Sequence, residues 1–385
     1  MMEGERPVQP ASLLARLRTL PDPRRRQGRR YPLAAIMGLL VLAAMHGETS
    51  VRGMWLWGCV RWDALWEPLG FWTPHRPPTL TTVWGLLARL DAVALDTLLS
   101  AWSSGGVGAA DSALSVDGKW LRGTRRAGQR ARKVVEVVSH QRAVVLGQRE
   151  APRGDELAAA LVLLREVPLQ DRVVTLDAGL LQRSVLEVIV AHGGAYLGVL
   201  KANQPGVAEA VTTWLETELS PPAQGPPPVH DTWTKAHGRL EHRAVWVVAA
   251  GELGPYLARE FGWPDVQQVG WVRRRWRYLN EPTWRGDETR LWITNLPQSR
   301  AGPAALAHLL RGHWTIENPV HWVRDVSWQE DRGHGRVVGV PLATRRNAVI
   351  NVLRGHGFSL MPDGRRWLAA QPDLGLPFLV RPLER

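Results

Sequence analysis

The chain has 385 residues, enough to bury a substantial core and to divide into two or three structural units. Its formal charge is +12, from 48 Lys and Arg against 36 Asp and Glu, and only four of the cations are lysines. Guanidinium groups bind phosphate through paired hydrogen bonds, so this excess favours a nucleic acid as partner, although arginine-rich codon usage would give the same composition. The single cysteine, Cys59, excludes an internal disulfide framework and a Cys-cluster zinc site, and it suits a reducing cytoplasm.

The first hundred residues show helical periodicity. Apolar residues recur on one face in 11–20, in the run Leu33–Met45 and in 79–102. The run Leu33–Met45 is shorter than the roughly 20 residues of a membrane-spanning helix, which predicts a buried core helix, and the N-terminus lacks the pattern of a signal peptide. We therefore expect residues 1–105 to form an all-helical domain, with neither export nor a membrane partner.

Beyond a small-residue linker that ends near Ser112, short β-branched runs alternate with helical patterns. Strands are expected at Leu114–Val116, 133–139, 143–150, 172–178 and 195–201, and helices at 154–167, 181–193 and 207–219. This alternation predicts an α/β fold over residues 106–385, with a mixed sheet and helices packed on its faces. A proline-rich connection opens a β-rich insertion at about 220–298, with strands at 243–250, 267–279 and 288–296.

Three segments are rich in one kind of residue. Five arginines lie between Pro21 and Arg30, where they either form a solvated run or contact backbone phosphates. The stretch Arg273–Tyr278, "RRRWRY", is either a second basic surface or an edge strand whose charges discourage pairing. Five tryptophans of the helical region are expected to pack in its core: Trp55, Trp57, Trp62, Trp66 and Trp72.

Three acidic residues stand where sheet proteins collect functional groups. Asp117 follows one apolar strand and Asp177 ends another immediately before a helix, so two neighbouring strands would bring both to one edge of the sheet. Glu317 comes much later, and Pro319 places a helix start or kink close to it. If that segment is helical, one face holds His313, Glu317, His321 and Arg324.

A set of three carboxylates suits Mg²⁺ or Mn²⁺, which prefer oxygen ligands. Two such ions about 4 Å apart activate an attacking hydroxyl and stabilise the leaving oxygen in phosphodiester displacement. Taken singly, each acid also fits a turn, a cap or an ion pair, and Asp177 could simply cap the helix that follows it. His313 and His321 could also serve as a pair of zinc ligands, but no third ligand pattern accompanies them.

Five motifs, in this order, resemble bacterial insertion-sequence transposases of the H-repeat-associated group, within the DDE superfamily: "DGKWLRG", "VVTLDAGLLQ", "LKANQP", "HGRLEHR" and "RGHWTIENPVHWVRDVSWQED". The segment that begins "LPDPRRRQGRRYPLAA" is similar to that group's associated N-terminal domain. The resemblance implies an RNase H-like catalytic domain at 106–385 behind a DNA-binding domain at 1–105. It also implies that Asp117, Asp177 and Glu317 are the catalytic and metal-binding carboxylates, holding two Mg²⁺ or Mn²⁺ ions.

The implied activity is cutting of double-stranded DNA at the terminal inverted repeats of an element, followed by joining of the freed 3′-hydroxyl to target DNA. A homodimer on DNA, and a place at the nucleoid in the bacterial cytoplasm, belong to the same expectation. By charge and position, eight residues are expected to contact DNA: Lys119, Arg122, Lys201, Asn203, Gln204, His313, His321 and Arg324.

The chain departs from the group's pattern at two places. A Tyr-Arg-Glu-Lys signature around the third carboxylate corresponds here to Leu310, His313, Glu317 and Arg324, without the tyrosine. The histidine that usually follows the second aspartate is replaced by Leu180 or Leu181 before Gln182. Two alternatives therefore stay open: a DNA-binding relic that no longer cuts, and a metal-dependent nuclease of the same fold.

Overall fold

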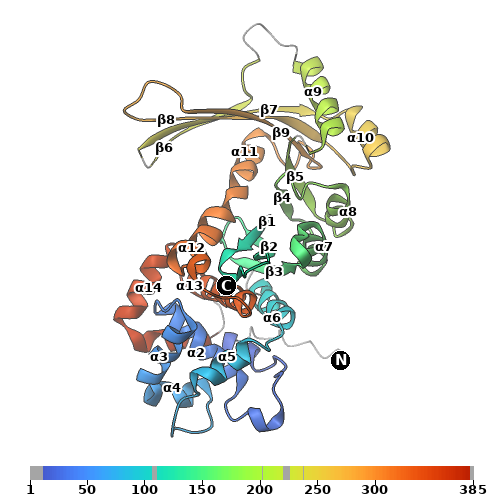
Figure 1. Cartoon of the computed structure of the whole chain (residues 1–385). Helices are drawn as coiled ribbons and strands as arrows, with labels where there is room; N and C mark the ends of the chain where they lie inside the picture. Colours follow the sequence, from blue (N-terminus) through green and yellow to red (C-terminus); the bar gives the residue numbers. More distant parts are fainter. Residues whose placement is uncertain (1–11, 106–110, 202, 220–225, 237, 382–385) are drawn as a thin grey trace, which may run out of the picture. The chain divides into compact units, whose positions relative to one another are not determined.

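The computed structural model of the protein describes residues 12–105, 111–201, 203–219, 226–236 and 238–381. Parts of the small-residue linker and of the proline-rich connection lie outside these ranges. The described chain is a mixed α/β fold (Figure 1), as predicted, and it divides into two compact units. The first unit comprises Met1–Asp111, Gly118–Ala159 and Thr315–Arg385, and the second unit comprises Ser112–Asp117 and Ala160–Trp314.

The N-terminal part of the first unit is helical, with α1 Leu13–Leu17, α2 Leu33–Met45, α3 Val51–Val60, α4 Trp62–Leu69, α5 Leu80–Leu87 and α6 Ala92–Gly105. The continuous apolar pattern over 79–102 gives two helices rather than one. Asp91 accepts the backbone N–H groups of Val93 and Ala94, so its side chain starts a new helix at this point.

Helix α2 lies at the centre of this core, since all 13 of its residues are buried. By length and composition alone, Arg26–Met45 would suffice to cross a membrane, yet 78% of its most apolar window is buried inside the protein. Four of the five expected core tryptophans are buried or pack against the core: Trp55, Trp57, Trp62 and Trp66. The expectation is wrong for Trp72, which is 69% exposed.

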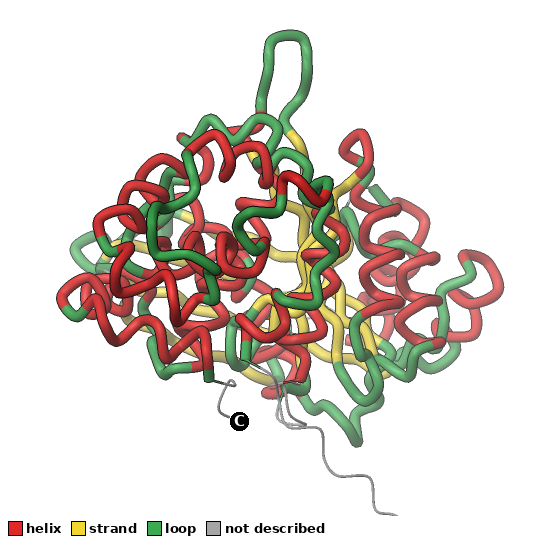
Figure 2. The backbone as a smooth tube through the Cα atoms, turned by 90° about the horizontal axis from the view of Figure 1, so that it is seen from below, coloured by secondary structure: helices red, strands yellow, loops and turns green. Residues whose placement is uncertain are grey.

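The C-terminal part of the first unit adds α12 Val323–Ser327, α13 Gly339–Gly355, α14 Met361–Ala370 and α15 Gly375–Val380. Helix α13 buries polar side chains as well as apolar ones, and several of these polar groups form hydrogen bonds. Asn351 bonds to both backbone groups of Val145, and Thr344 donates to Asp96. Figure 2 colours the helices red and the strands yellow along the chain.

The strands are β1 Ala113–Leu121, β2 Arg132–Ser139, β3 Val145–Ala151, β4 Val173–Leu176, β5 Ala195–Leu200, β6 His230–Ala236, β7 Arg239–Ala249, β8 Gln268–Tyr278 and β9 Gly286–Thr294. Within the described residues they are hydrogen-bonded in the order β3-β2-β1-β4-β5-β9-β8-β7-β6. Strands β1, β4 and β5 run parallel, and from β5 onward the neighbours are antiparallel. All four residues of β4 are buried, which explains its wholly apolar appearance apart from Thr175.

The second unit contains the expected β-rich insertion. The helices of the second unit are α8 Arg183–Ala191, α9 Pro205–Leu219, α10 Leu253–Phe261 and α11 Pro303–Gly312. Helix α7 Glu156–Glu166 has residues in both units. Helices α9 and α10 lie along the ribbon of β7 to β9 in Figure 1. The edge-strand interpretation of Arg273–Tyr278 is wrong, because β8 pairs with β7 on one side and β9 on the other. The sequence pattern also missed β6 and α10.

Candidate active site

Asp117 and Asp177 occupy corresponding places on neighbouring parallel strands. Val116 of β1 is in register with Leu176 of β4, and each is followed by an aspartate, Asp117 within β1 and Asp177 just after the end of β4. Adjacent strands lie about 4.8 Å apart, so the backbones at the two acids are close neighbours. The Oδ1 atom of Asp177 accepts the N–H of Leu180 at 3.0 Å, so its side chain closes the turn after β4 rather than capping α8.

Glu317 opens a π-helical turn, Glu317–Trp322, where the sequence allowed either a helix start or a kink. The backbone N–H of His321 reaches back five residues to the carbonyl of Ile316, at 3.0 Å. Pro319 lies inside this turn and has no N–H to donate, which favours the looser hydrogen-bond pattern. The carboxylate of Glu317 is half exposed, and its Oε2 atom lies 3.2 Å from Nδ1 of His321.

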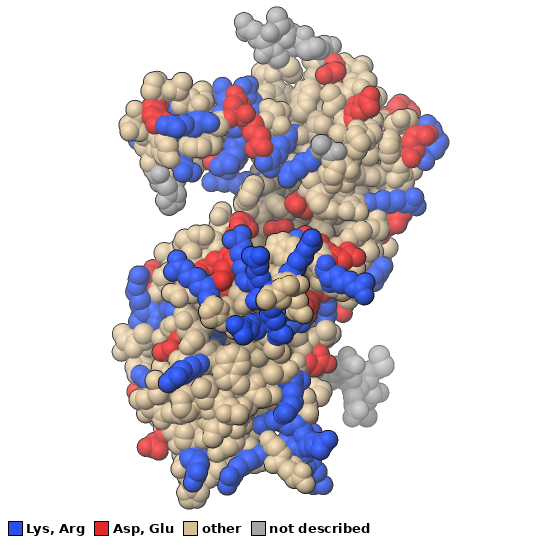
Figure 3. Space-filling model, in the orientation of Figure 1, with Lys and Arg blue, Asp and Glu red and all other residues tan. Residues whose placement is uncertain are grey.

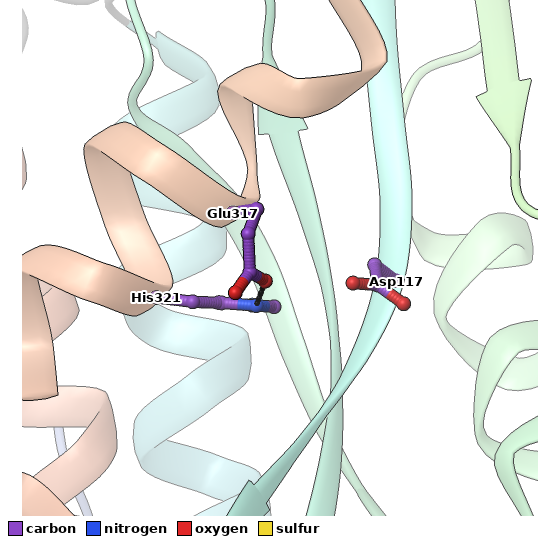
Figure 4. A group of neighbouring side chains, drawn as sticks. All are labelled: Asp117, Glu317 and His321. Carbon is purple, nitrogen blue, oxygen red and sulfur yellow. Dashed lines mark hydrogen bonds and ion pairs between the residues drawn. The ribbon is translucent and has the colours of Figure 1, made fainter. Parts of the chain in front are cut away.

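Figure 4 shows the side chains of Asp117, Glu317 and His321, with Asp117 on its strand facing the π-helical turn. One potential ligand atom from each of the three lies within 4.8 Å of the others. Asp177 is not a member of this group of described residues. The arrangement therefore joins the first and third predicted carboxylates, while Asp177 is linked to Asp117 by strand register.

Behind Glu317 lies a fully buried ionic network of the first unit. Glu136 of β2 has no exposed surface, and its carboxylate contacts Nε2 of His321 at 3.0 Å and pairs with Arg324. Asn347 donates to the same carboxylate at 2.5 Å, and Arg324 also pairs with Glu330 at 2.7 Å. Burial alone would raise the pKa of Glu136, but the charges of Arg324 and His321 outweigh it and lower the pKa to about 2.

His321 is best understood as a support for Glu317 rather than as a metal ligand. Burial disfavours its charged form, yet the carboxylates of Glu136 and Glu317 outweigh burial and raise its pKa. An imidazolium that donates from both nitrogens has no lone pair to offer a metal. The hydrogen bond from His321 in turn lowers the pKa of Glu317, which keeps that carboxylate ionised.

Several residues expected to contact DNA form ion pairs or hydrogen bonds with acids of the first unit. Lys119 is buried, and its Nζ atom lies 2.6 Å from Oδ2 of Asp325. Arg324 has no exposed surface, and the buried His321 faces two carboxylates. A direct contact from Arg324 to DNA would require breaking its buried ion pairs, so we assign it a structural role. Only Arg122 is well exposed, with Nε 3.5 Å from Oδ2 of Asp331.

The expected DNA contacts of the second unit support its own backbone. Asn203 donates to the carbonyl of Ala178 at 2.7 Å, and Gln204 donates to that of Leu181. These two amides therefore hold the turn that follows Asp177. His313 lies 3.1 Å from the hydroxyl of Thr175, and Lys201, which follows β5, is exposed to solvent.

Two acids of the buried ionic network, Glu136 and Glu330, are not among the site residues predicted from the sequence. Glu136 left one usable signal, since it is the lone carboxylate in the apolar run "KVVEVVS". A buried carboxylate in such a strand requires a cation, and the chain offers many. Glu330 is 5% exposed and pairs with Arg324 and Arg346, and its sequence context gives no comparable signal.

Comparison with known proteins shows the family of this chain. Residues 108–336 match the model of the transposase DDE domain, and residues 14–103 match the model of its associated domain, DDE_Tnp_1-associated. A DDE domain has an RNase H-like fold and depends on divalent metal ions. The chain therefore belongs to the transposase DDE domain family, an enzyme family that acts on DNA.

The similar proteins include bacterial transposases. The chain is 25% identical over 324 residues to "Putative transposase YncI" of Escherichia coli O157:H7, covering 83% of this chain and 81% of that protein. It is 28% identical over 227 residues, 57% of each chain, to "H repeat-associated putative transposase YhhI" of Escherichia coli K12. A solved piggyBac transposase synaptic complex with hairpin DNA aligns with a TM-score of 0.41 and 10% identity, covering 97% of this chain and 79% of that one.

Proposed function

We propose that the protein cuts double-stranded DNA at the terminal inverted repeats of an insertion element and joins the freed 3′-hydroxyl to target DNA. The observation that supports this most is the approach of the Asp117 and Glu317 carboxylates, from β1 and from a turn 200 residues later, to within 4.8 Å. Carboxylate oxygens at this distance can bind one cation between them. The parallel register of β1 and β4 supports the proposal of Asp177 as the third acid.

The donor set fits a hard divalent cation. Asp117, Asp177 and Glu317 offer carboxylate oxygens, the ligands that Mg²⁺ and Mn²⁺ prefer, and the described chain offers no cysteine to the cluster. When bound there, two such ions would activate the attacking oxygen and neutralise charge on the leaving oxygen. We propose these three acids as their ligands.

The chain's own residues would prepare this site in two ways. His321, fixed from behind by Glu136, orients the carboxylate of Glu317 and keeps it ionised. Asn203 and Gln204 hold the turn that follows Asp177. In the proposed sequence, water first attacks the phosphodiester at the element end, and the released 3′-hydroxyl then attacks a phosphodiester of the target.

The proposal is tested by cleavage of labelled duplex DNA that contains the sequences flanking the gene, in Mg²⁺ or Mn²⁺. The isosteric variants Asp117→Asn, Asp177→Asn and Glu317→Gln remove one charge each without changing side-chain volume. Glu209→Gln, an exposed acid of α9, is the matched control. We expect nicking at the element ends by the unmodified protein and the control, and its loss in the three site variants while DNA binding persists.

Other outcomes separate the alternatives. DNA binding by the unmodified protein without any cleavage in either metal would favour a relic. Cleavage without joining to a target, at positions unrelated to the element ends, would favour a nuclease. Cleavage that survives Glu317→Gln would show that another acid is the third ligand, and Asp325 would be the next to replace.

A further inference from the structure

Two segments of the first unit lie together beside the end of β1. The first segment runs from the 3-10 turn Arg122–Thr124 to Arg130, and the second is 331–337. The N–H of Arg122 donates to Asp331 at 3.1 Å, and the N–H of Arg336 donates to the carbonyl of Gly123 at 3.3 Å. Because these bonds involve the backbone, they fix the two segments against each other.

The two segments enclose a pair of connected hollows of about 640 and 990 Å³. Both hollows share Arg122, Arg125, Arg126 and Gly128, so they form one groove. Gly128 has a φ of 70°, a left-handed conformation that glycine adopts without strain and that closes the loop tip. We name this feature the arginine groove after its cations: Arg122, Arg125, Arg126, Arg130, Arg332 and Arg336.

The charge of the arginine groove is largely uncompensated. All six arginines are exposed. Among the described residues, Arg122 alone of the six has a carboxylate within 4 Å, that of Asp331 at 3.5 Å. Arginines of β8 differ, since Arg273 and Arg274 each pair with an acid. Figure 3 shows Lys and Arg side chains gathered over the region of β1 to β3 and α13.

Five guanidinium groups without acidic partners around one groove create a positive potential that attracts a polyanion. Guanidinium forks match phosphate oxygens, and such contacts position a duplex without reading its sequence. From Asp117 to Arg122 the strand advances five residues, about 16 Å at roughly 3.3 Å per residue. That length corresponds to about five nucleotides of a DNA strand, at roughly 3.4 Å each.

We infer that the arginine groove binds the phosphate backbone of duplex DNA a few nucleotides from the phosphodiester that is cut, independently of base sequence. The inference rests on the proposed function, which supplies DNA as the partner. It assigns the DNA contact to the groove in place of the buried Lys119 and Arg324.

The test uses the triple variant R125A/R126A/R130A of the full chain and duplex DNA of two unrelated sequences, with binding measured by fluorescence anisotropy across a salt series. A matched control, R183A/R259A/R366A, removes the same charge from exposed arginines that each lie beside an acid elsewhere. A second variant, R125K/R126K/R130K, keeps the charge of the groove. Near-ultraviolet circular dichroism checks that each variant is folded.

Loss of three phosphate contacts should flatten the slope of log K against log salt by about 2.7, and weaken binding on the order of 100-fold near 0.1 M salt, equally for both sequences. The lysine variant should keep most of the slope, and the control should keep all of it. Equal slopes and affinities for R125A/R126A/R130A and the unmodified protein would overturn the inference while leaving the proposed function intact. Failure of the unmodified protein to bind either duplex would overturn both.

Discussion

The imidazole of His321 joins two carboxylates of very different exposure: its Nε2 atom lies 3.0 Å from buried Glu136, and its Nδ1 atom lies 3.2 Å from half-exposed Glu317. A residue of strand β2 thereby influences the orientation and ionisation of a carboxylate on the π-helical turn. Glu136 is itself fixed by Arg324 and Asn347. The outer carboxylate is therefore supported by a chain of buried ionic contacts.

We predict that Glu136→Gln destabilises the protein by about 3 kcal/mol, because it removes one partner of a buried ion pair and leaves Arg324 and His321 less compensated. The free energy of unfolding from urea titration checks this. Glu288→Gln removes an exposed acid paired with Arg290 and should change stability by less than about 0.5 kcal/mol. Equal stabilities of the two variants would show that the buried network contributes little.

We predict that His321→Ala lowers the rate of DNA cleavage by about 10- to 100-fold, because Glu317 loses the donor that orients it. DNA affinity should stay unchanged, since His321 is buried and faces carboxylates. His321→Asn keeps an N–H donor in the side chain and should recover part of the rate. Measurement of cleavage under single-turnover conditions, beside binding, separates these effects, and His308→Ala, an exposed histidine of α11, is the control. Loss of affinity in parallel with rate would assign His321 to the DNA surface instead.

Local periodicity was sufficient to predict much of the fold. The run Leu33–Met45 forms α2 with the predicted bounds, and the alternating segments after Ser112 form β1 to β5 with α7 and α8. Strand β6 was missed because its burial alternates along a polar sequence, "HDTWTKA", in which few apolar residues mark the inner face. The strand forms because it pairs with the neighbouring strand β7, and this cross-strand pairing is not visible in the periodicity of β6 alone.

The site was harder to predict because charge and position along the sequence do not reveal burial. Arg324 and Lys119 looked like phosphate contacts, but their partners, Glu136 and Asp325, lie on other elements. The same limit applies to Asn203, whose amide donates to the backbone of Ala178. The sequence alone does not distinguish an exposed cation from a buried one, because burial depends on tertiary contacts.

Asp96 of α6 predicts a pH dependence of stability. Burial raises its pKa to about 8, despite hydrogen bonds from Thr344 and Gln148. An aspartate in an unfolded chain titrates near about 3.9. Between these two pKa values the folded state therefore binds a proton that the unfolded state has lost. The contribution of Asp96 to the free energy of unfolding is greatest below about pH 4. It declines by up to about 1.4 kcal/mol per pH unit until about pH 8.

Asp96→Asn removes this titration. In urea titrations at each pH from 4 to 8, we expect the free energy of unfolding of the unmodified protein to fall relative to that of Asp96→Asn as the pH rises. Comparing the two proteins cancels the opposite contribution of Glu136, whose lowered pKa stabilises the fold above about pH 4. Asp363→Asn, at an exposed acid, should run parallel to the unmodified protein. Parallel profiles for Asp96→Asn would mean that Asp96 is ionised in the folded protein.

The close approach of the two segments of the arginine groove gives the last prediction. A Cβ atom at Gly123 would overlap the carbonyl oxygen of Gly333 and lie 2.7 Å from that of Glu330, and both are backbone atoms that cannot turn away. Gly123→Ala should therefore destabilise the protein by about 1–3 kcal/mol. Gly85→Ala in α5 meets nothing within 4 Å and should stabilise it by up to about 1 kcal/mol.

Both substitutions add one methyl group and restrict the unfolded chain to the same extent, so the difference between them isolates the clash in the folded state. Neither glycine has a left-handed φ, which excludes backbone strain as a separate cause. Thermal and urea unfolding of the two variants measure that difference. If Gly123→Ala matched Gly85→Ala, the segments would not be packed backbone to backbone, and the groove would lack the fixed shape that places its arginines together.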